Sequence, residues 1–215
     1  WDETFALAKS LQPDVLIFSD AGPDIRWIGN ERGYAGETNW SMLNTDEVVI
    51  GAADGAYLNS GDPEGKDWVV PLCNTSIRPG WFYHADQDDR VKSLEQLLEV
   101  YYRSVGRNCV LLLNIPPDQR GLFHENDVAA LREFRRVLDA TFALNLAEGK
   151  TVTADSHRGG HAYFSPANIV DQDLDSYWAA EDGVRQATLE VDLGELTLFD
   201  RVLLQEPIRF GQRIS

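Results

Sequence analysis

The sequence predicts an α/β fold with a parallel sheet, open or closed into a barrel, followed by a smaller all-β region. In the first part, short continuous apolar runs alternate with amphipathic stretches of helical period, which is the pattern of βαβ units. In the second part, the apolar residues follow a period of two, which is typical of half-buried antiparallel strands. We therefore expect two domains, residues 1–142 and 143–215.

The first elements are a helix and a strand. Apolar side chains recur at helical spacing in the first dozen residues, and Pro13 ends this predicted helix. Residues 15–18 then form a continuous apolar run, as expected of a strand that is buried on both faces of a parallel sheet. The polar turn at residues 19–23 ends the strand.

Two further strands and two further helices follow. The apolar runs at residues 68–73 and 109–113 predict strands, although Pro71 weakens the first prediction because proline cannot donate to a sheet ladder. Amphipathic helices are predicted over residues 91–102, after an acidic cluster that favours a helix start, and over residues 128–138. In such a fold, the loops that follow the carboxyl ends of the strands are expected to hold the functional site.

The all-β region contains three predicted strands, at residues 151–154, 187–193 and 201–205. The middle one alternates apolar and polar residues most regularly. These strands are too few to close a sandwich, so we expect only part of that domain in this chain.

The charge and composition exclude several partners. Thirty-five acidic against nineteen basic residues give a net charge of −16, which repels nucleic acid and anionic lipid surfaces. The longest apolar run is far shorter than the roughly 20 residues that cross a bilayer, so no membrane span is expected. Cys73 and Cys109 are expected to be buried free thiols, with a disulfide as the alternative. The histidines lack metal-ligand spacing, so no metal is predicted.

The loop at residues 20–44 is rich in aromatic and charged side chains, and a loop of this length is more often functional than idle. Tryptophans beside carboxylates suit a sugar-binding site. The C–H faces of a sugar ring stack on indole, while the sugar hydroxyls form hydrogen bonds with charged groups. Glu31 is flanked by nearby glycines, which fits a general acid, although on the residues alone a solvated charge is favoured. Asp20 and Asp24 compete for the same role.

The segment at residues 74–84 follows the second predicted strand and carries three consecutive aromatic residues together with Arg78 and His84. Core packing accounts for some of these aromatic side chains, and His84 is expected to be a hydrogen-bonded structural histidine. The chain has no nucleophile elbow, no Walker loop and no dinucleotide-binding glycine pattern. Positive evidence for acyl transfer, nucleotide hydrolysis and hydride transfer is therefore missing.

Three ordered motifs resemble the α-L-fucosidases of glycoside hydrolase family 29, most closely the branch specific for 1,3/1,4 fucosyl linkages. They are SDAGPDIRWIGNE at residues 19–31, SIRPGWFY at 76–83 and LLLNIPP at 111–117. The resemblance covers about residues 1–140. It implies that residues 1–142 are the C-terminal portion of a catalytic (β/α)8-like TIM barrel, in which an aspartate nucleophile and a glutamate acid/base carry out a retaining double displacement.

By this resemblance Glu31 is the acid/base, with Glu64 as the alternative, and Arg26 and Trp81 line the fucose pocket. The family's nucleophile precedes the first helix of this chain, so it is expected upstream of Trp1. The chain as given is therefore expected to be an inactive fragment. The acid must hold its proton near neutral pH through burial or a nearby negative charge. The resemblance implies no metal and no organic cofactor.

Residues 143–215 resemble part of a discoidin-like (coagulation factor 5/8 type C) β-sandwich. The motifs that carry this resemblance are ANIVD at 167–171, YWA at 177–179, LEVDLG at 189–194 and GQRI at 211–214. Trp178 and Asp171 are expected to be packing and turn residues rather than sugar contacts.

The resemblance implies a retaining exo-glycosidase that hydrolyses terminal α-L-fucose, α-1,3/1,4-linked, from a fucosylated oligosaccharide or glycoconjugate glycan. A substrate of this kind implies a periplasmic or secreted protein. Two alternatives stay open: a non-catalytic glycan-binding protein built on a degenerate barrel plus a sandwich, and a barrel glycosidase that acts on another sugar.

Overall fold

The computed structural model describes residues 1–212 of the chain. It divides into two compact units, Trp1–Asp139 and Ala140–Ser215, three residues before the boundary that the sequence predicts. The second of the two units is described up to residue 212, so Arg213 and Ile214 of the GQRI motif lie outside the described residues.

The first unit contains both strands and helices, and its last helix ends two residues beyond the boundary between the units. The elements are α1 (Asp2–Leu11), β1 (Phe18–Ser19), β2 (Ile25–Trp27), β3 (Met42–Leu43), α2 (Gly55–Ser60), β4 (Asp67–Trp68), β5 (Val70–Ser76), α3 (Leu94–Ser104), β6 (Val110–Asn114) and α4 (Glu125–Thr141).

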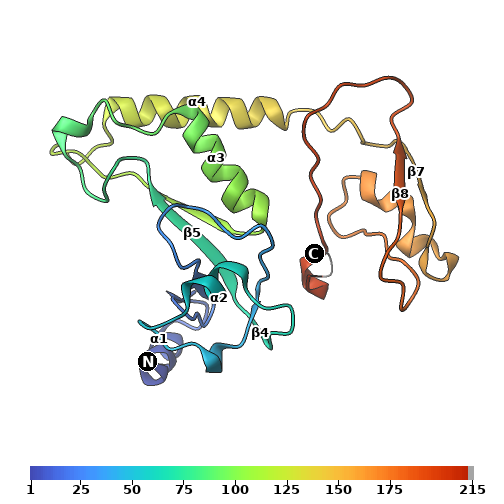
Figure 1. The fold of residues 1–215 in the computed structure, drawn as a ribbon, viewed down its shortest axis with the longest axis horizontal. Helices are drawn as coiled ribbons and strands as arrows, with labels where there is room; N and C mark the ends of the chain where they lie inside the picture. Colours follow the sequence, from blue (N-terminus) through green and yellow to red (C-terminus); the bar gives the residue numbers. More distant parts are fainter. Residues whose placement is uncertain (213–215) are drawn as a thin grey trace. The chain divides into compact units, whose positions relative to one another are not determined.

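Four of these strands form a parallel sheet in the order β1-β2-β5-β6, with the long strand β5 in its interior (Figure 1). The pairing of β5 with β2 begins at Ile25↔Val70, and its pairing with β6 begins at Leu72↔Val110. The predicted α/β fold with a parallel sheet is therefore confirmed. Because the carboxyl ends of parallel strands meet at one edge, the loops after β2, β5 and β6 start from the same edge of the sheet.

The strand predicted at residues 15–18 is shorter and begins later than expected. Only Phe18 and Ser19 pair with β2. The backbone N–H of Ile17 donates instead to the carboxylate of Asp24, at 2.7 Å. A side chain from the following turn thus takes the place of a ladder partner.

Pro71 lies within β5 without a lost hydrogen bond. The N–H of Val70 donates to the carbonyl of Asp24 at 3.1 Å, and the carbonyl of Leu72 accepts from Ile28 at 3.1 Å, so these residues face β2. Pro71 faces the opposite side, where the pairing with β6 begins only at Leu72. The position therefore needs no donor, and proline is tolerated in a strand with neighbours on both sides.

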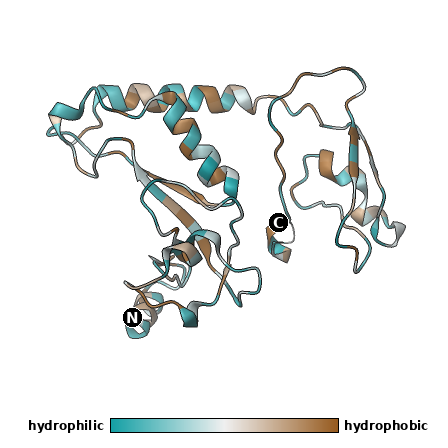
Figure 2. Ribbon diagram, in the orientation of Figure 1, coloured by the Kyte–Doolittle hydropathy of each residue, from teal (hydrophilic) through white to brown (hydrophobic). Residues whose placement is uncertain are grey.

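The helix α3 begins at Leu94, later than predicted, because Ser93 and Gln96 form a capping box. The hydroxyl of Ser93 accepts from the N–H of Gln96 at 3.3 Å, and the Gln96 side chain accepts from the N–H of Ser93 at 2.9 Å. The acidic cluster at residues 86–89 therefore does not start this helix. The helix α4 covers the second predicted stretch, and Figure 2 shows both hydrophobic and hydrophilic segments along it, as an amphipathic helix requires.

The cysteines lie in the core of the first unit, as predicted. Cys73 and Cys109 are buried free thiols in one apolar cluster with Ile28 and Ala35. Their sulfur atoms lie 2.7 Å apart. The contact with Cys73, together with burial, raises the pKa of the Cys109 thiol, so it is neutral at physiological pH.

The second unit pairs two of its three predicted strands. β7 (Thr151–Ala154) and β8 (Leu189–Asp192) are antiparallel, with Val152 opposite Val191. Residues 201–205 are not a strand in this structure, so the third strand prediction is wrong here. Trp178 donates its indole N–H to the carbonyl of Ser156 at 3.0 Å, and the Asp171 carboxylate accepts from the Ser176 hydroxyl at 2.7 Å. Both contacts fit the packing and turn roles expected of Trp178 and Asp171.

Candidate active site

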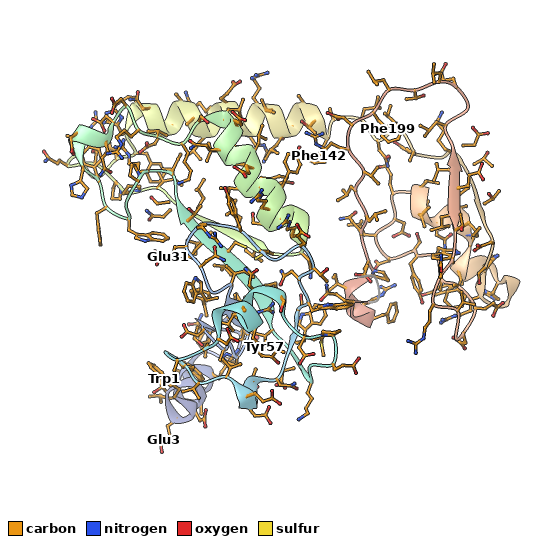
Figure 3. The ribbon with its side chains drawn as sticks, in the orientation of Figure 1. Trp1, Glu3, Glu31, Tyr57, Phe142 and Phe199 are labelled. Carbon is orange, nitrogen blue, oxygen red and sulfur yellow. The ribbon has the colours of Figure 1, made fainter. Side chains whose placement is uncertain are left out.

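Glu31 lies on the loop between β2 and β3, where Figure 3 labels it. Gly29 has a φ of 82° and Gly33 a φ of 81°, a region that favours glycine. A Cβ at Gly29 would lie 2.6 Å from the carbonyl oxygen of Gly55, so the loop backbone packs directly against the first turn of α2. The two glycines therefore allow the loop backbone to pack closely on both sides of Glu31, whose side chain is exposed.

Trp81 meets Glu31 from the loop that follows β5. Its indole Nε1 donates a hydrogen bond to Oε2 of Glu31 at 3.0 Å, across 50 residues of sequence. β2 and β5 are neighbours in the sheet, so their loops leave the same edge side by side. The structure thus brings together two of the three residues predicted for the site.

An open cavity of about 340 Å³ is lined by both residues. Other residues around it include Tyr34, Ser76 and Lys92. Its volume is at the lower end of the roughly 300–1,000 Å³ range of small-molecule sites, which is enough for a single sugar ring. The lining combines aromatic faces with hydroxyl and charged groups, as sugar recognition requires.

The backbone of Trp81 is held from the ends of two strands. Nδ2 of Asn114, the last residue of β6, donates to the carbonyl of Trp81 at 3.0 Å and to the hydroxyl of Ser76 at 3.1 Å. The Ser76 hydroxyl donates to the carbonyl of Gly80 at 2.7 Å. The sequence showed Asn114 only as part of a motif, because its bonds cross between strands that are distant in sequence.

Arg26 is not at the cavity, in contrast to the sequence prediction. Its side chain is fully buried and donates to four protein oxygens at 2.7–3.0 Å. The acceptors are the carbonyls of Leu58, Val69 and Trp40 and the side-chain oxygen of Asn39. Burial lowers the pKa of Arg26 to about 10, so the group keeps its charge at neutral pH. Arg26 therefore holds the surrounding loops together and does not face a ligand in this structure.

The competing carboxylates are occupied elsewhere or lie away from the cavity. Asp24 forms an ion pair with Lys9 at 2.8 Å, and the hydrogen bond from Lys9 outweighs burial and lowers the pKa of Asp24. Asp20 accepts the N–H of Gly51 at 2.7 Å. Glu64 is exposed on the turn before β4 and does not line the cavity. Among these carboxylates, only Glu31 contacts Trp81.

A buried ion pair below the Trp81 loop is the main feature that sequence reasoning missed. Nε of Arg78 lies 3.0 Å from a carboxylate oxygen of Asp127, and both side chains are fully buried. Burial disfavours the charged guanidinium, but the hydrogen bonds that it donates to Asp127 and Asp88 outweigh burial and raise the pKa of Arg78. The available signal was Arg78 among the apolar and aromatic residues of the stretch 77–83, since a buried charge needs a partner.

Two further observations concern metals and membranes. Among residues 1–212, no group of three or more histidine, cysteine, aspartate or glutamate side chains is arranged to hold a metal ion. In the same part of the chain, no helix is both long enough and apolar enough to span a membrane.

Comparisons with known proteins identify similar sequences and structures. Residues 53–141 match the family model described as Alpha-L-fucosidase. Alpha-L-fucosidase 1 of Arabidopsis thaliana is 44% identical over 216 residues, which cover all of this chain and 42% of that protein. These matches support a relationship between this chain and the α-L-fucosidases of glycoside hydrolase family 29. The chain spans less than half the length of this curated relative.

Solved structures of the family have a similar fold. A crystal structure named SpGH29 superposes with a TM-score of 0.82 at 44% identity, covering 90% of this chain and 41% of that one. A Ruminococcus gnavus glycoside hydrolase 29 fucosidase in complex with fucose superposes with a TM-score of 0.76 at 34% identity, covering 85% of this chain and 37% of that one. The α/β unit is therefore similar to that of family 29 fucosidases, whose catalytic domain is a TIM-like barrel.

Proposed function

We propose that this chain supplies the general acid/base of a retaining exo-α-L-fucosidase that removes terminal, α-1,3/1,4-linked fucose from glycans. The hydrogen bond between Trp81 and Glu31 in a sugar-sized cavity carries this proposal. It puts a carboxyl group and an aromatic ring at the edge of the sheet where sites of parallel α/β folds gather. The family 29 relatives support the choice of fucose as the sugar, because one solved relative is described in complex with fucose.

In the proposed reaction an aspartate upstream of Trp1 attacks the anomeric carbon and forms a glycosyl ester. Glu31 gives its proton to the glycosidic oxygen as the bond to the aglycone breaks. Glu31 then takes a proton from water, which attacks the ester, releases fucose and frees the aspartate. Retention by this route requires the two carboxyl groups to lie about 5–5.5 Å apart.

The upstream aspartate has a second role in this proposal, which is to keep Glu31 protonated. Glu31 is exposed among the described residues. The indole N–H of Trp81 orients the carboxyl group but does not supply a proton for the leaving group. A negatively charged nucleophile nearby favours a protonated partner, which is what the acid step needs.

Trp81 has a second proposed role, which is to present its ring to the sugar. Trp81→Ala is expected to weaken fucose binding about 3–10-fold, because an aromatic contact contributes roughly 0.5–1.5 kcal/mol. Trp81→Phe, the matched control, keeps a ring and is expected to keep most of the affinity. Titration calorimetry with fucose measures both, and unchanged affinity in Trp81→Ala would assign Trp81 to packing alone.

Product analysis on the full-length protein tests the proposed function. Incubation with α-1,3- and α-1,4-fucosylated oligosaccharides is expected to release fucose, with the α anomer appearing first in the NMR spectrum. A panel of other terminal sugars serves as the control. Release of a different sugar would replace the substrate assignment. Binding without release would favour the non-catalytic glycan-binding alternative, which no observation in this chain favours at present.

The remaining parts of the proposal concern the second unit and the location of the protein. We propose that residues 143–215 belong to a discoidin-like domain and that the protein acts in the periplasm or outside the cell. The motifs quoted for that domain support the first statement, and the nature of a fucosylated glycan supports the second.

A further inference from the structure

The ion pair between Arg78 and Asp127 joins the start of the Trp81 loop to the helix α4. Arg78 is 1% exposed and Asp127 is 0% exposed. Nε of Arg78 lies 3.1 Å from Oδ1 and 3.0 Å from Oδ2 of Asp127. Arg78 lies just beyond the end of β5, and Asp127 lies in the first turn of α4. The contact therefore fixes the loop at its first residues.

The same guanidinium also holds the far end of the loop. Its Nη1 donates to Oδ1 of Asp88 at 2.9 Å, and its central carbon lies 4.9 Å from the centroid of the Tyr83 ring. The Tyr83 hydroxyl donates to the other oxygen of Asp88 at 3.2 Å. Arg78 thus contacts residues on both sides of Trp81, and Trp81 projects from between them to Glu31.

The arrangement around Arg78 is not one that maximises the stability of the fold. Nη2 of Arg78 is buried without a hydrogen-bond partner within residues 1–212. A buried ion pair adds little net stability over well-packed apolar residues. An arginine at this position is therefore better explained by the geometry that its planar fork imposes than by stability alone.

We propose that Arg78 is a positioning residue, which fixes residues 78–88 through Asp127 and Asp88 so that Trp81 meets Glu31. The proposal rests on the acid/base role proposed for Glu31. A displacement of about 1 Å at a catalytic group can cost on the order of 10²-fold in rate, so a fixed loop would serve the chemistry directly. Arg78→Lys keeps the positive charge but removes the planar guanidinium, so this variant tests the geometry of the contact separately from its charge.

The direct readout is the indole N–H of Trp81, observed by NMR with ¹⁵N-labelled tryptophan and assigned with Trp81→Phe. In the wild-type protein its shift is expected to follow the ionisation of Glu31, and Glu31→Gln is expected to abolish that pH dependence. In Arg78→Lys the pH-dependent shift is expected to fall at least about twofold, because the hydrogen bond is no longer held. Arg135→Lys, at an exposed ion pair with Asp139, is the matched control and is expected to change nothing.

Activity in the full-length protein gives the second readout. Arg78→Lys is expected to lower kcat/KM for a fucoside with a poor leaving group by about 10–100-fold, with a smaller loss for an activated aryl fucoside. If Arg78→Lys does not fold, Asp88→Asn carries both tests, because Asp88 is only partly buried and the pair with Asp127 stays intact.

The outcomes separate this proposal from the proposed function. An unchanged Trp81 titration in Arg78→Lys, or in Asp88→Asn where the first variant does not fold, overturns the positioning role. Equal losses on both fucosides also overturn it, because a merely structural role would affect both substrates alike. A wild-type protein without fucosidase activity contradicts the proposed function, whereas the NMR titration still decides whether Arg78 holds Trp81 against Glu31.

Discussion

Glu31→Ala in the full-length protein is expected to slow the hydrolysis of a fucoside with a poor leaving group by about 10²–10⁴-fold, the usual contribution of a general acid. The alkoxide that leaves without a proton is unstable, so this substrate depends on the acid. An activated aryl fucoside leaves as a stable phenolate, so the formation of the glycosyl ester is expected to lose far less. The comparison of kcat/KM for the two substrates measures this difference.

Glu64→Ala is the matched control, because Glu64 is also an exposed loop glutamate but does not line the cavity. It is expected to leave kcat/KM unchanged for both substrates. A selective loss at Glu64 in place of Glu31 would transfer the acid role to Glu64. Equal losses on both substrates in Glu31→Ala would remove Glu31 from that role.

Asp127→Ala is expected to lower the free energy of unfolding by about 3–5 kcal/mol, because it leaves the charge of Arg78 buried without its main partner. This is a large fraction of the roughly 5–15 kcal/mol that stabilises a typical domain. Urea denaturation followed by circular dichroism measures the change as a lower midpoint at constant slope.

Asp139→Ala, on the same helix, is the control for loss of helix charge and ion pairing. Asp139 forms an exposed ion pair with Arg135, and exposed pairs contribute little. Its midpoint is expected to match the wild type within error. If the midpoints of the two variants coincide, the Arg78–Asp127 pair is not the buried anchor that the structure shows.

The sequence predicted the parallel sheet well and its details less well. Apolar runs mark the interior strands β5 and β6, because residues buried on both faces must be apolar. The short strand β2 was missed, because only three residues pair there and Arg26 lies in the middle of them. The start of β1 depends on a side-chain bond from Asp24, which no local pattern reveals.

The positions of Glu31 and Trp81 at the cavity and the position of Arg26 in the core depend on different contacts. Glu31 and Trp81 were predicted from the motifs that contain them, and the structure brings them together because their loops leave the neighbouring strands β2 and β5. The place of Arg26 depends on carbonyls of Leu58, Val69 and Trp40, which only the folded chain assembles. The partner of Arg78 is likewise 49 residues away, so its burial could not be seen from the sequence.

Azide rescue of Glu31→Ala tests the central claim most directly. In the full-length variant with an activated aryl fucoside, azide needs no general base and can attack the glycosyl ester that waits for water. We expect faster turnover with azide and α-L-fucosyl azide as the product, with retained configuration. No rescue, or a product of inverted configuration, would contradict the assignment of Glu31 as the acid/base that works opposite an upstream nucleophile.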